Sequence, residues 1–223
     1  MDVRWKHLWT SIVCGPMGCG KTIFVKTFFR HLTTMLDVRF ERILFYYAEK
    51  NEYANNTMVK SKKNIIKFHK GLPCPEDYSN DPLFPKLVII DDLMRKSSSC
   101  DAIVDLFTKG SHHKNLSVIL ISQNLFHQRR GQRDISLNAN YIIVLKNPRD
   151  RAQIHLARQV YPDDSKFMEE AYYDATSRPH EYLLLDLKQS TSDEYRFRTC
   201  IFPDDTWHYA YVPRRSSNRS GLV

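Results

Sequence analysis

A stretch near the N-terminus carries the residue types and spacing that bind phosphate. Residues 15–22 follow the pattern of a glycine, four further residues, and then Gly-Lys-Ser/Thr. Glycines let such a loop turn tightly and approach an anion without a Cβ in the way. Backbone N–H groups and the positive end of the next helix would hold the β-phosphate, Lys21 would reach the β- and γ-phosphates, and the Thr22 hydroxyl would bind Mg²⁺. The spacing therefore predicts a site for a nucleoside triphosphate and Mg²⁺ made by Gly15, Pro16, Met17, Gly18, Cys19, Gly20, Lys21 and Thr22.

Two acidic residues follow an apolar run later in the chain. Leu87–Ile90 is wholly apolar and predicts a central parallel strand, with Asp91 and Asp92 at its carboxyl end. Ligands of open α/β sheets bind at the carboxyl ends of the strands. We therefore expect Asp91 to bind Mg²⁺ and Asp92 to act as the general base that orients or activates water. The alternative for Asp92 is a helix cap or a loop acid.

A glutamine follows the next buried run. Residues 116–124 predict another strand with polar residues at its carboxyl end, among them Gln123. Beside a γ-phosphate, a glutamine can hydrogen-bond both phosphate and water, so it can sense or position them. We favour that catalytic role for Gln123 over the alternative, a polar residue that only ends a strand.

Strands and helices must hold these residues in place. The loop at 15–22 lies between an expected strand and an expected helix, which is the context that the motif requires. Residues 71–85 are rich in Pro, Asp and Asn and predict a loop. Alternation in the second strand of a C-terminal hairpin, 181–187 with 195–202, predicts that one of its faces is exposed to solvent. The other expected strands cover 9–14, 43–47, 65–69, 87–91 and 141–145, and the expected helices cover 21–36, 98–110, 152–160 and 163–176.

Length and composition bound the organisation. The 223 residues, 42% of them hydrophobic, suit a single α/β domain over 1–213 followed by a basic, flexible tail over 214–223. No run of 18 apolar residues is present, so we expect no membrane-spanning helix and no membrane partner. The five cysteines are scattered, which argues against a disulfide framework or a zinc site and favours a reducing, intracellular setting.

The charge balance points to anionic partners. The chain has a formal net charge of +8 and an isoelectric point near 9.2. Such an excess favours a polyanion such as nucleic acid, because neutralising phosphates releases counterions. Residues 129–151 hold six Lys or Arg against two Asp, close to expected strand ends, where they could contact the phosphates of DNA or of a neighbour's nucleotide. A merely basic, soluble surface is the alternative.

The order of these motifs resembles a known family. The loop 15–22, then Ile89–Leu93, then Ile121–Asn124, then the basic strand end 145–150 is similar to the poxvirus-type genome-packaging ATPases of the FtsK–HerA superfamily. The versions encoded by adintoviruses and Polinton-type elements look most alike. The resemblance covers roughly residues 7–190 and rests mainly on the combination of Ser-Gln-Asn with Lys-Asn-Pro-Arg-Asp.

The resemblance implies a P-loop NTPase fold of the RecA/FtsK type, with a mostly parallel central sheet flanked by helices and a C-terminal β-hairpin. It implies a homo-oligomeric ring, a hexamer or pentamer, that hydrolyses ATP at subunit interfaces and drives double-stranded DNA into a capsid, with a capsid or portal-vertex protein as partner. The setting would be the host nucleus or a cytoplasmic assembly site, with transient virion association. The arginine inserted by a neighbour would be Arg149, with Arg151 and Arg133 as the other candidates. Related cellular motors usually carry Glu where this chain has Asp92, which is shorter by a methylene.

Two other functions remain open at this point. A small-molecule or nucleoside kinase also uses a phosphate-binding loop, and residues 128–134 could imitate its arginine-bearing lid. A nucleotide-dependent DNA-binding protein with negligible turnover is the second. Gln123 and the basic charge weigh against the kinase, and the pair Asp91 and Asp92 weighs against the protein without turnover.

Overall fold

A single sheet organises the molecule. The computed structural model describes residues 4–48, 53, 64–79, 83–93, 97–110, 114–124, 131–148 and 165–213. Within these residues, the strands form a nine-stranded sheet in the order β3-β2-β4-β5-β1-β6-β7-β8-β9. The strands are β1 (Thr10–Cys14), β2 (Arg42–Tyr47), β3 (Ile66–Lys70), β4 (Lys86–Asp91), β5 (Leu116–Ser122), β6 (Tyr141–Leu145), β7 (Tyr182–Asp186), β8 (Phe197–Thr199) and β9 (Tyr209–Tyr211).

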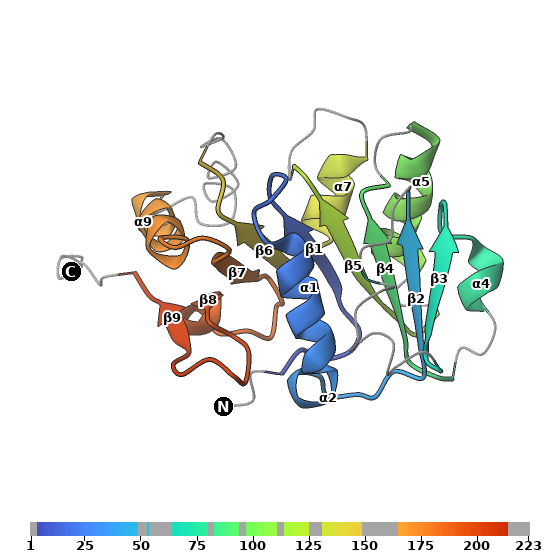
Figure 1. Ribbon diagram of the computed structural model, residues 1–223, viewed down its shortest axis with the longest axis horizontal. Coiled ribbons are helices and arrows are strands. Elements are labelled where there is room, and N and C mark those ends of the chain that lie inside the picture. Colours follow the sequence, from blue (N-terminus) through green and yellow to red (C-terminus); the bar gives the residue numbers. More distant parts are fainter. Residues whose placement is uncertain are drawn as a thin grey trace, which may run out of the picture.

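The sheet has a parallel part and an antiparallel part. β3, β2, β4, β5, β1 and β6 pair in parallel, whereas β7, β8 and β9 continue the sheet in antiparallel pairs. Figure 1 shows the antiparallel strands at one end of the sheet, beside the β6 edge of the parallel part. The fold is therefore α/β with a mostly parallel sheet and a C-terminal antiparallel extension, as the sequence predicts.

Helices cover both faces of the sheet (Figure 1). α1 packs Phe24, Phe28 and Phe29 into one apolar core, and its stripe of three- and four-residue steps explains why this segment is an amphipathic helix. α5, α7 and α9 pack into a second core, on the other face, which contains the alternate side chains of the same strands. The helices are α1 (Lys21–Arg30), α2 (Leu32–Met35), α4 (Pro75–Ser79), α5 (Ser97–Asp105, continued by a π-helical turn, Leu106–Gly110), α7 (Gln132–Leu137) and α9 (Ser165–Ala175).

Three local expectations need correction. The helix expected over 21–36 is interrupted at His31, whose φ of −105° and ψ of 17° separate α1 from α2. The segment 71–85 is not only a loop, because α4 forms within it and begins with Pro75, a residue suited to the first helical turn. A further strand, β9, pairs with β8, so the extension is three-stranded and not a simple hairpin.

The second strand of that hairpin has no solvent-exposed face. All three residues of β8 are buried, and the Arg198 guanidinium donates to a carboxylate oxygen of Asp186 on β7 at 2.6 Å. Alternation of charged and apolar residues predicts an exposed face, but here the charged side chain is buried against a charged partner. The second core receives Phe197, so both faces of β8 are covered.

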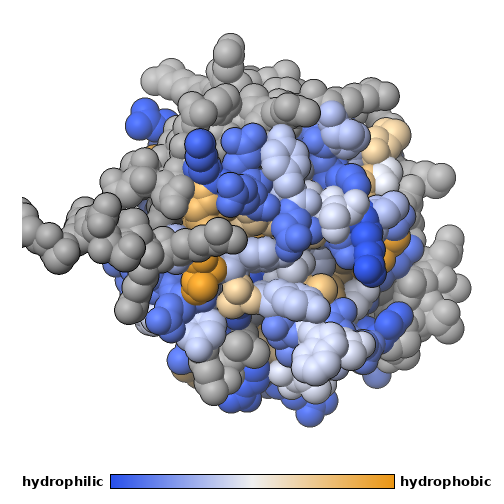
Figure 2. Space-filling view, turned by 90° about the vertical axis from the view of Figure 1, so that its left-hand side faces the viewer, coloured by the Kyte–Doolittle hydropathy of each residue, from blue (hydrophilic) through white to orange (hydrophobic). Residues whose placement is uncertain are grey.

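The end of the molecule with the antiparallel strands has a mostly polar surface. Figure 2 looks at this end, and hydrophilic residues cover most of what is coloured, with the most hydrophobic residues in small separate patches. The exposed aromatic side chains here include Tyr209 on β9 and Trp207 just before it. Scattered apolar residues of this kind are normal on a protein surface.

Some expectations lie outside the described residues or stay untested. The helix expected over 152–160 and the tail 214–223 fall outside the described ranges, and the single domain over 1–213 stays a prediction. In the part of the chain that the structure describes, no helix is long and apolar enough to cross a membrane.

Candidate active site

The phosphate-binding motif forms the turn between β1 and α1. The backbone N–H of Gly15 donates to the Ser122 carbonyl at 3.3 Å, and this contact ties the loop to the end of β5. Gly18 and Gly20 have φ values of 78° and 111°, a region that side-chain-bearing residues rarely adopt. At Gly15 a Cβ would lie 2.6 Å from the Cys19 sulfur. The three glycines are therefore needed by the loop itself, for backbone conformation or for space.

The strand order brings the other predicted residues to this loop. β5 lies between β1 and β4, so Ser122 and Gln123 end up between the loop and the acids that follow β4. All the carboxyl ends of these parallel strands meet at the same edge of the sheet. A cavity of about 640 Å³ opens at this edge. The predicted site residues that line it are Met17, Gly18, Gly20, Lys21, Thr22, Asp91, Asp92 and Gln123.

Lys21 lies across its own loop. Its ammonium group donates to the carbonyl oxygens of Gly15 and Pro16, at 2.5 Å and 2.8 Å. Both acceptors are neutral, whereas phosphate oxygens are charged and make stronger hydrogen bonds with an ammonium group. A triphosphate in the cavity would therefore draw the Lys21 ammonium away from the two carbonyls.

Asp92 and Gln123 are in direct contact. The Gln123 side-chain amide donates to a carboxylate oxygen of Asp92 at 2.8 Å, across the boundary between β4 and β5. The backbone of Asp92 has a φ of 50°, which is uncommon but tolerated by Asp, and its N–H donates to the Ile121 carbonyl at 3.2 Å. Backbone and side chain therefore both orient this carboxylate from the neighbouring strand, and both residues line the cavity.

The two cysteines next to the site do not contribute a nucleophile. Burial raises the pKa of the Cys19 thiol, and the nearby Lys21 only partly opposes this. Burial also raises the pKa of the fully buried Cys14, the last residue of β1. Both thiols stay protonated near neutral pH and act as small apolar side chains that fill space behind the loop.

Sequence reasoning missed one residue of the cavity, His180. It lies in the turn before β7, lines the cavity, and has a φ of 67°. A Cβ on Gly20 would lie 2.9 Å from the Cβ of His180 and 3.1 Å from its Nδ1, so the histidine packs directly against the loop. The sequence around it, Arg178-Pro179-His180, signals only a turn.

Of the three arginines expected to act on a neighbour's nucleotide, the structure describes only Arg133. Arg149 and Arg151 lie outside the described residues. Arg133 is exposed on α7, and α7 contributes no residue to the cavity lining. Among the described residues that line it, Lys21 is the only lysine or arginine.

The residues present suit Mg²⁺. Asp91 and Thr22 both line the cavity and offer a carboxylate and a hydroxyl, hard oxygen ligands of the kind that Mg²⁺ takes. In the described ranges there is no group of three or more His, Cys, Asp or Glu side chains that could enclose a metal ion. Mg²⁺ does not need such a cage, because it is usually held by one or two protein oxygens together with substrate phosphates and water.

Comparisons with known proteins add no functional argument. No protein-family model matches the chain, and no curated protein is similar to it. Among solved structures it is similar to EssC (ATPases 2 and 3) from Geobacillus thermodenitrificans, with a TM-score of 0.46 and 10% identity over 66% of this chain and 34% of that one. The cytoplasmic domain of the Type VII secretion ATPase EccC from Thermomonospora curvata gives a TM-score of 0.48 and 12% identity over 86% and 23%. The chain thus spans about a third or less of the length of these two proteins.

Proposed function

We propose that this protein is a Mg²⁺-dependent ATPase. The observation that carries the proposal is the hydrogen bond between Gln123 and Asp92, inside the cavity that also holds Lys21 and Asp91. A cavity that only binds a nucleotide needs phosphate contacts and a metal ligand. A second carboxylate, oriented by an amide beside the expected γ-phosphate, is what water activation additionally requires.

Each residue has a defined part in the reaction. Lys21 leaves the carbonyl oxygens of Gly15 and Pro16 and contacts the β- and γ-phosphates, where its charge offsets the charge of the transition state. Asp92 accepts the proton of the attacking water, and Gln123 keeps the carboxylate and the water aligned. Thr22 and Asp91 would hold Mg²⁺, which supplies neutralisation of charge on the phosphate oxygens when bound.

Steady-state hydrolysis by three variants tests this function. Asp92→Asn keeps the size and the contact with Gln123 but cannot accept a proton, so we expect the rate to fall by about 10²–10⁴-fold. Lys21→Ala should lose nucleotide affinity as well as rate. Asp105→Asn is the matched control, because this exposed acid at the end of α5 pairs with Lys109 of the following turn and does not line the cavity, so its rate should equal that of the wild type.

Two results would contradict the ATPase. An Asp92→Asn rate equal to the wild-type rate would favour a nucleotide-binding protein without catalytic use of this acid. A phosphorylated small molecule formed in step with ADP would favour the kinase. Thermal melting of each variant separates a lost reaction from a lost fold.

We further propose that the protein forms a ring of identical subunits and that ATP hydrolysis drives double-stranded DNA through this ring, as in packaging of a virus-type genome into a capsid. The net charge of +8 supports a polyanion partner. In a ring, a neighbouring subunit would insert an arginine beside Lys21, the only lysine or arginine that lines the cavity among the described residues. The capsid protein and the host-cell assembly site belong to the same proposal.

Duplex DNA and mass measurement test the motor. We expect duplex DNA to stimulate ATP hydrolysis and nucleotide to promote a hexamer or pentamer. Mixing Arg149→Ala with Lys21→Ala subunits should restore some activity, because mixed rings contain interfaces with both groups intact. Hydrolysis without stimulation by DNA and without assembly would leave the ATPase in place and refute the motor.

A further inference from the structure

The cavity has two ends that belong to different parts of the sheet. β5 and β4 lie on one side of β1, and they bring Gln123, Asp91 and Asp92 to the cavity. β6 and β7 lie on the other side of β1. β7 is antiparallel to β6, with Tyr182 opposite Leu145, so β7 begins where β6 ends. The turn before β7 therefore reaches the same edge as the loop, and it brings His180 to the opposite end of the cavity from the acids.

The position of the acids fixes the direction of a bound triphosphate. If Asp92 activates water and Gln123 contacts the γ-phosphate, the γ-phosphate lies at the end of the cavity near β4 and β5. The loop between β1 and α1 then holds the other phosphates of the chain. The remaining part of the nucleotide, its ribose and base, must then leave the loop away from the acids.

Two side chains of the cavity lining are suited to a nucleoside. His180 presents an aromatic ring next to Gly20. Ile23, in the first turn of α1, lines the same cavity, and 51% of its surface is exposed. A flat ring and an aliphatic side chain beside a phosphate loop match the faces of a base better than they match further phosphates.

The turn that carries His180 is held by other residues. The carboxylate of Glu181 accepts from the backbone N–H of Arg178 at 2.7 Å. The Lys146 ammonium donates to the carbonyl oxygen of Ser177 at 2.6 Å, which ties the turn to the end of β6. The left-handed backbone at residue 180 suits histidine but equally suits asparagine. The imidazole ring is therefore not needed to build the turn.

We propose that His180 and Ile23 form a nucleoside subsite, in which the His180 ring stacks on the base of the bound nucleoside triphosphate. The subsite rests on the proposed ATPase function for the direction of the nucleotide. It assigns a role to the antiparallel extension, which otherwise holds no residue of the reaction.

Binding of ATP and of tripolyphosphate to the full chain with Mg²⁺ tests the subsite. Tripolyphosphate carries the phosphates alone, so a nucleoside contact affects only ATP. His180→Asn keeps a residue that tolerates the left-handed backbone and removes the ring. We expect the Kd for ATP to rise about tenfold, which is in the range of base–aromatic stacking, while the Kd for tripolyphosphate stays unchanged. Ile23→Ser should weaken ATP binding by a smaller factor.

Leu137→Ser is the control for loss of an exposed apolar side chain. Leu137 is 66% exposed on α7, away from the cavity lining, and its replacement should change neither constant. An equal loss of ATP and tripolyphosphate affinity in His180→Asn would show a phosphate contact and overturn the subsite. Unchanged ATP affinity would overturn it too. Hydrolysis by the wild-type protein is measured separately. If the wild type does not hydrolyse ATP while His180→Asn still loses affinity for ATP but not for tripolyphosphate, the subsite is supported and the ATPase is refuted.

Discussion

The parallel and antiparallel parts of the sheet bury their strands in different ways. β1, β4 and β5 bury mostly apolar side chains on both faces, and β4 and β5 have polar side chains where they end. β7 and β8 are just as buried, yet they enclose the Asp186 carboxylate and the Arg198 guanidinium. Parallel strands place all their carboxyl ends at one edge, which concentrates chemistry there. The antiparallel part instead encloses a buried ion pair between two of its strands, and the turn before β7 brings it to the site.

The largest expected effect is a loss of folding stability when the buried ion pair of the antiparallel part is broken. The Asp186 and Arg198 side chains are 6% and 10% exposed, and Asp186 also accepts from the Thr191 hydroxyl at 2.9 Å. Removing one partner of a buried ion pair strands the other charge, so Asp186→Ala should lower the free energy of unfolding by about 3–5 kcal/mol. Urea denaturation measures this loss.

A double variant shows whether the charges themselves are needed. Asp186→Leu with Arg198→Met replaces the pair by apolar side chains and should recover most of the stability lost in Asp186→Ala. If the double variant is as unstable as Asp186→Ala, the ion pair itself stabilises the fold, beyond neutralising two buried charges. Wild-type stability in Asp186→Ala would remove the contrast between the two parts of the sheet.

The next effect concerns the contact between the two parts at the site. Gly18 and Gly20 both have positive φ, so alanine should cost about 1–2 kcal/mol of backbone strain at either position. Only Gly20 is crowded, since a Cβ there would meet His180, whereas nothing lies within 4 Å of a Cβ at Gly18. Overpacking typically costs a further ~1–3 kcal/mol.

Gly20→Ala should therefore lower both stability and ATP affinity more than Gly18→Ala does. Calorimetric titration with ATP and thermal melting of the two variants measure the difference. Equal losses would mean that His180 moves aside freely and that the antiparallel part does not constrain the loop.

The same contrast explains which features could be predicted from the sequence. β1, β4, β5 and their polar ends are continuous in the chain, so apolar runs followed by Asp91–Asp92 or Gln123 indicate both the strands and their chemistry. His180 has no such signal, because strand pairing between β7 and β6 brings it to the loop. The exposed face predicted for 195–202 is wrong for a related reason: alternation indicates which side chains share a face, but not whether a buried partner such as Asp186 lies on that face.

Short elements escaped prediction because their own sequences are ambiguous. β9 has three residues and α7 has six, too few to show a period. The apolar pattern over 21–36 continues through His31, but helix α1 ends there. His31 contacts Asp204, which lies far along the chain. Local patterns thus predicted the long buried strands well, whereas the break at His31 and the short elements have no signal in the local pattern.

A smaller effect should appear as pH dependence at the edge opposite the site. His7 contacts the Ser117 hydroxyl and the Asn115 side-chain oxygen, at 2.7 Å and 2.6 Å. Burial lowers the pKa of His7, with a further contribution from Lys188, and the hydrogen bond to Asn115 and the charge of Asp37 oppose this lowering. The folded protein therefore favours the neutral ring more than the unfolded chain does.

The sign of the pH dependence follows. Above a pH of about 6.5 the ring is neutral in both states and the stabilising difference is fully present. As the pH falls through 6.5, the unfolded chain takes up the proton first, so stability should decrease until the lowered pKa of the folded state is passed. His7→Gln should make the free energy of unfolding less dependent on pH between 7 and 5. The same change at exposed His208 is the control, and equal slopes in wild type and His7→Gln would contradict the assignment.

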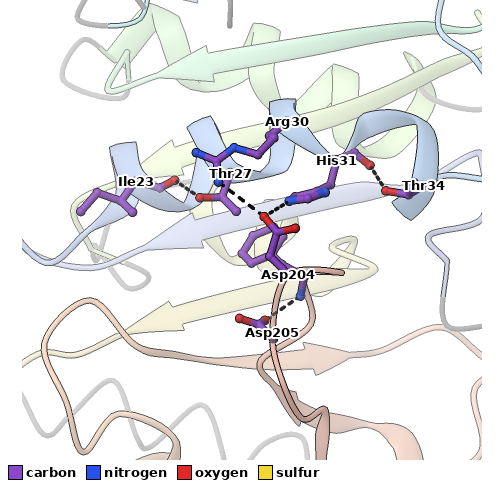
Figure 3. A network of polar contacts seen from close by, with 8 residues as sticks. Ile23, Thr27, Arg30, His31, Thr34, Asp204 and Asp205 are labelled. Carbon is purple, nitrogen blue, oxygen red and sulfur yellow. Dashed lines mark hydrogen bonds and ion pairs between the residues drawn. The ribbon is translucent and has the colours of Figure 1, made fainter.

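The smallest expected effect is on the contact between the antiparallel part and helix α1. Figure 3 shows Asp204 reaching the end of α1, where its carboxylate contacts His31 at 2.9 Å and Arg30 at 3.5 Å. Asp204 is 60% exposed, and exposed ion pairs contribute under about 1 kcal/mol, so Asp204→Asn should lower stability only slightly. The difference from wild type should shrink further as salt is raised, because screening weakens exposed pairs. A loss above ~2 kcal/mol that salt does not reduce would mean that this contact holds the antiparallel part firmly to the end of α1 and is not an ordinary exposed ion pair.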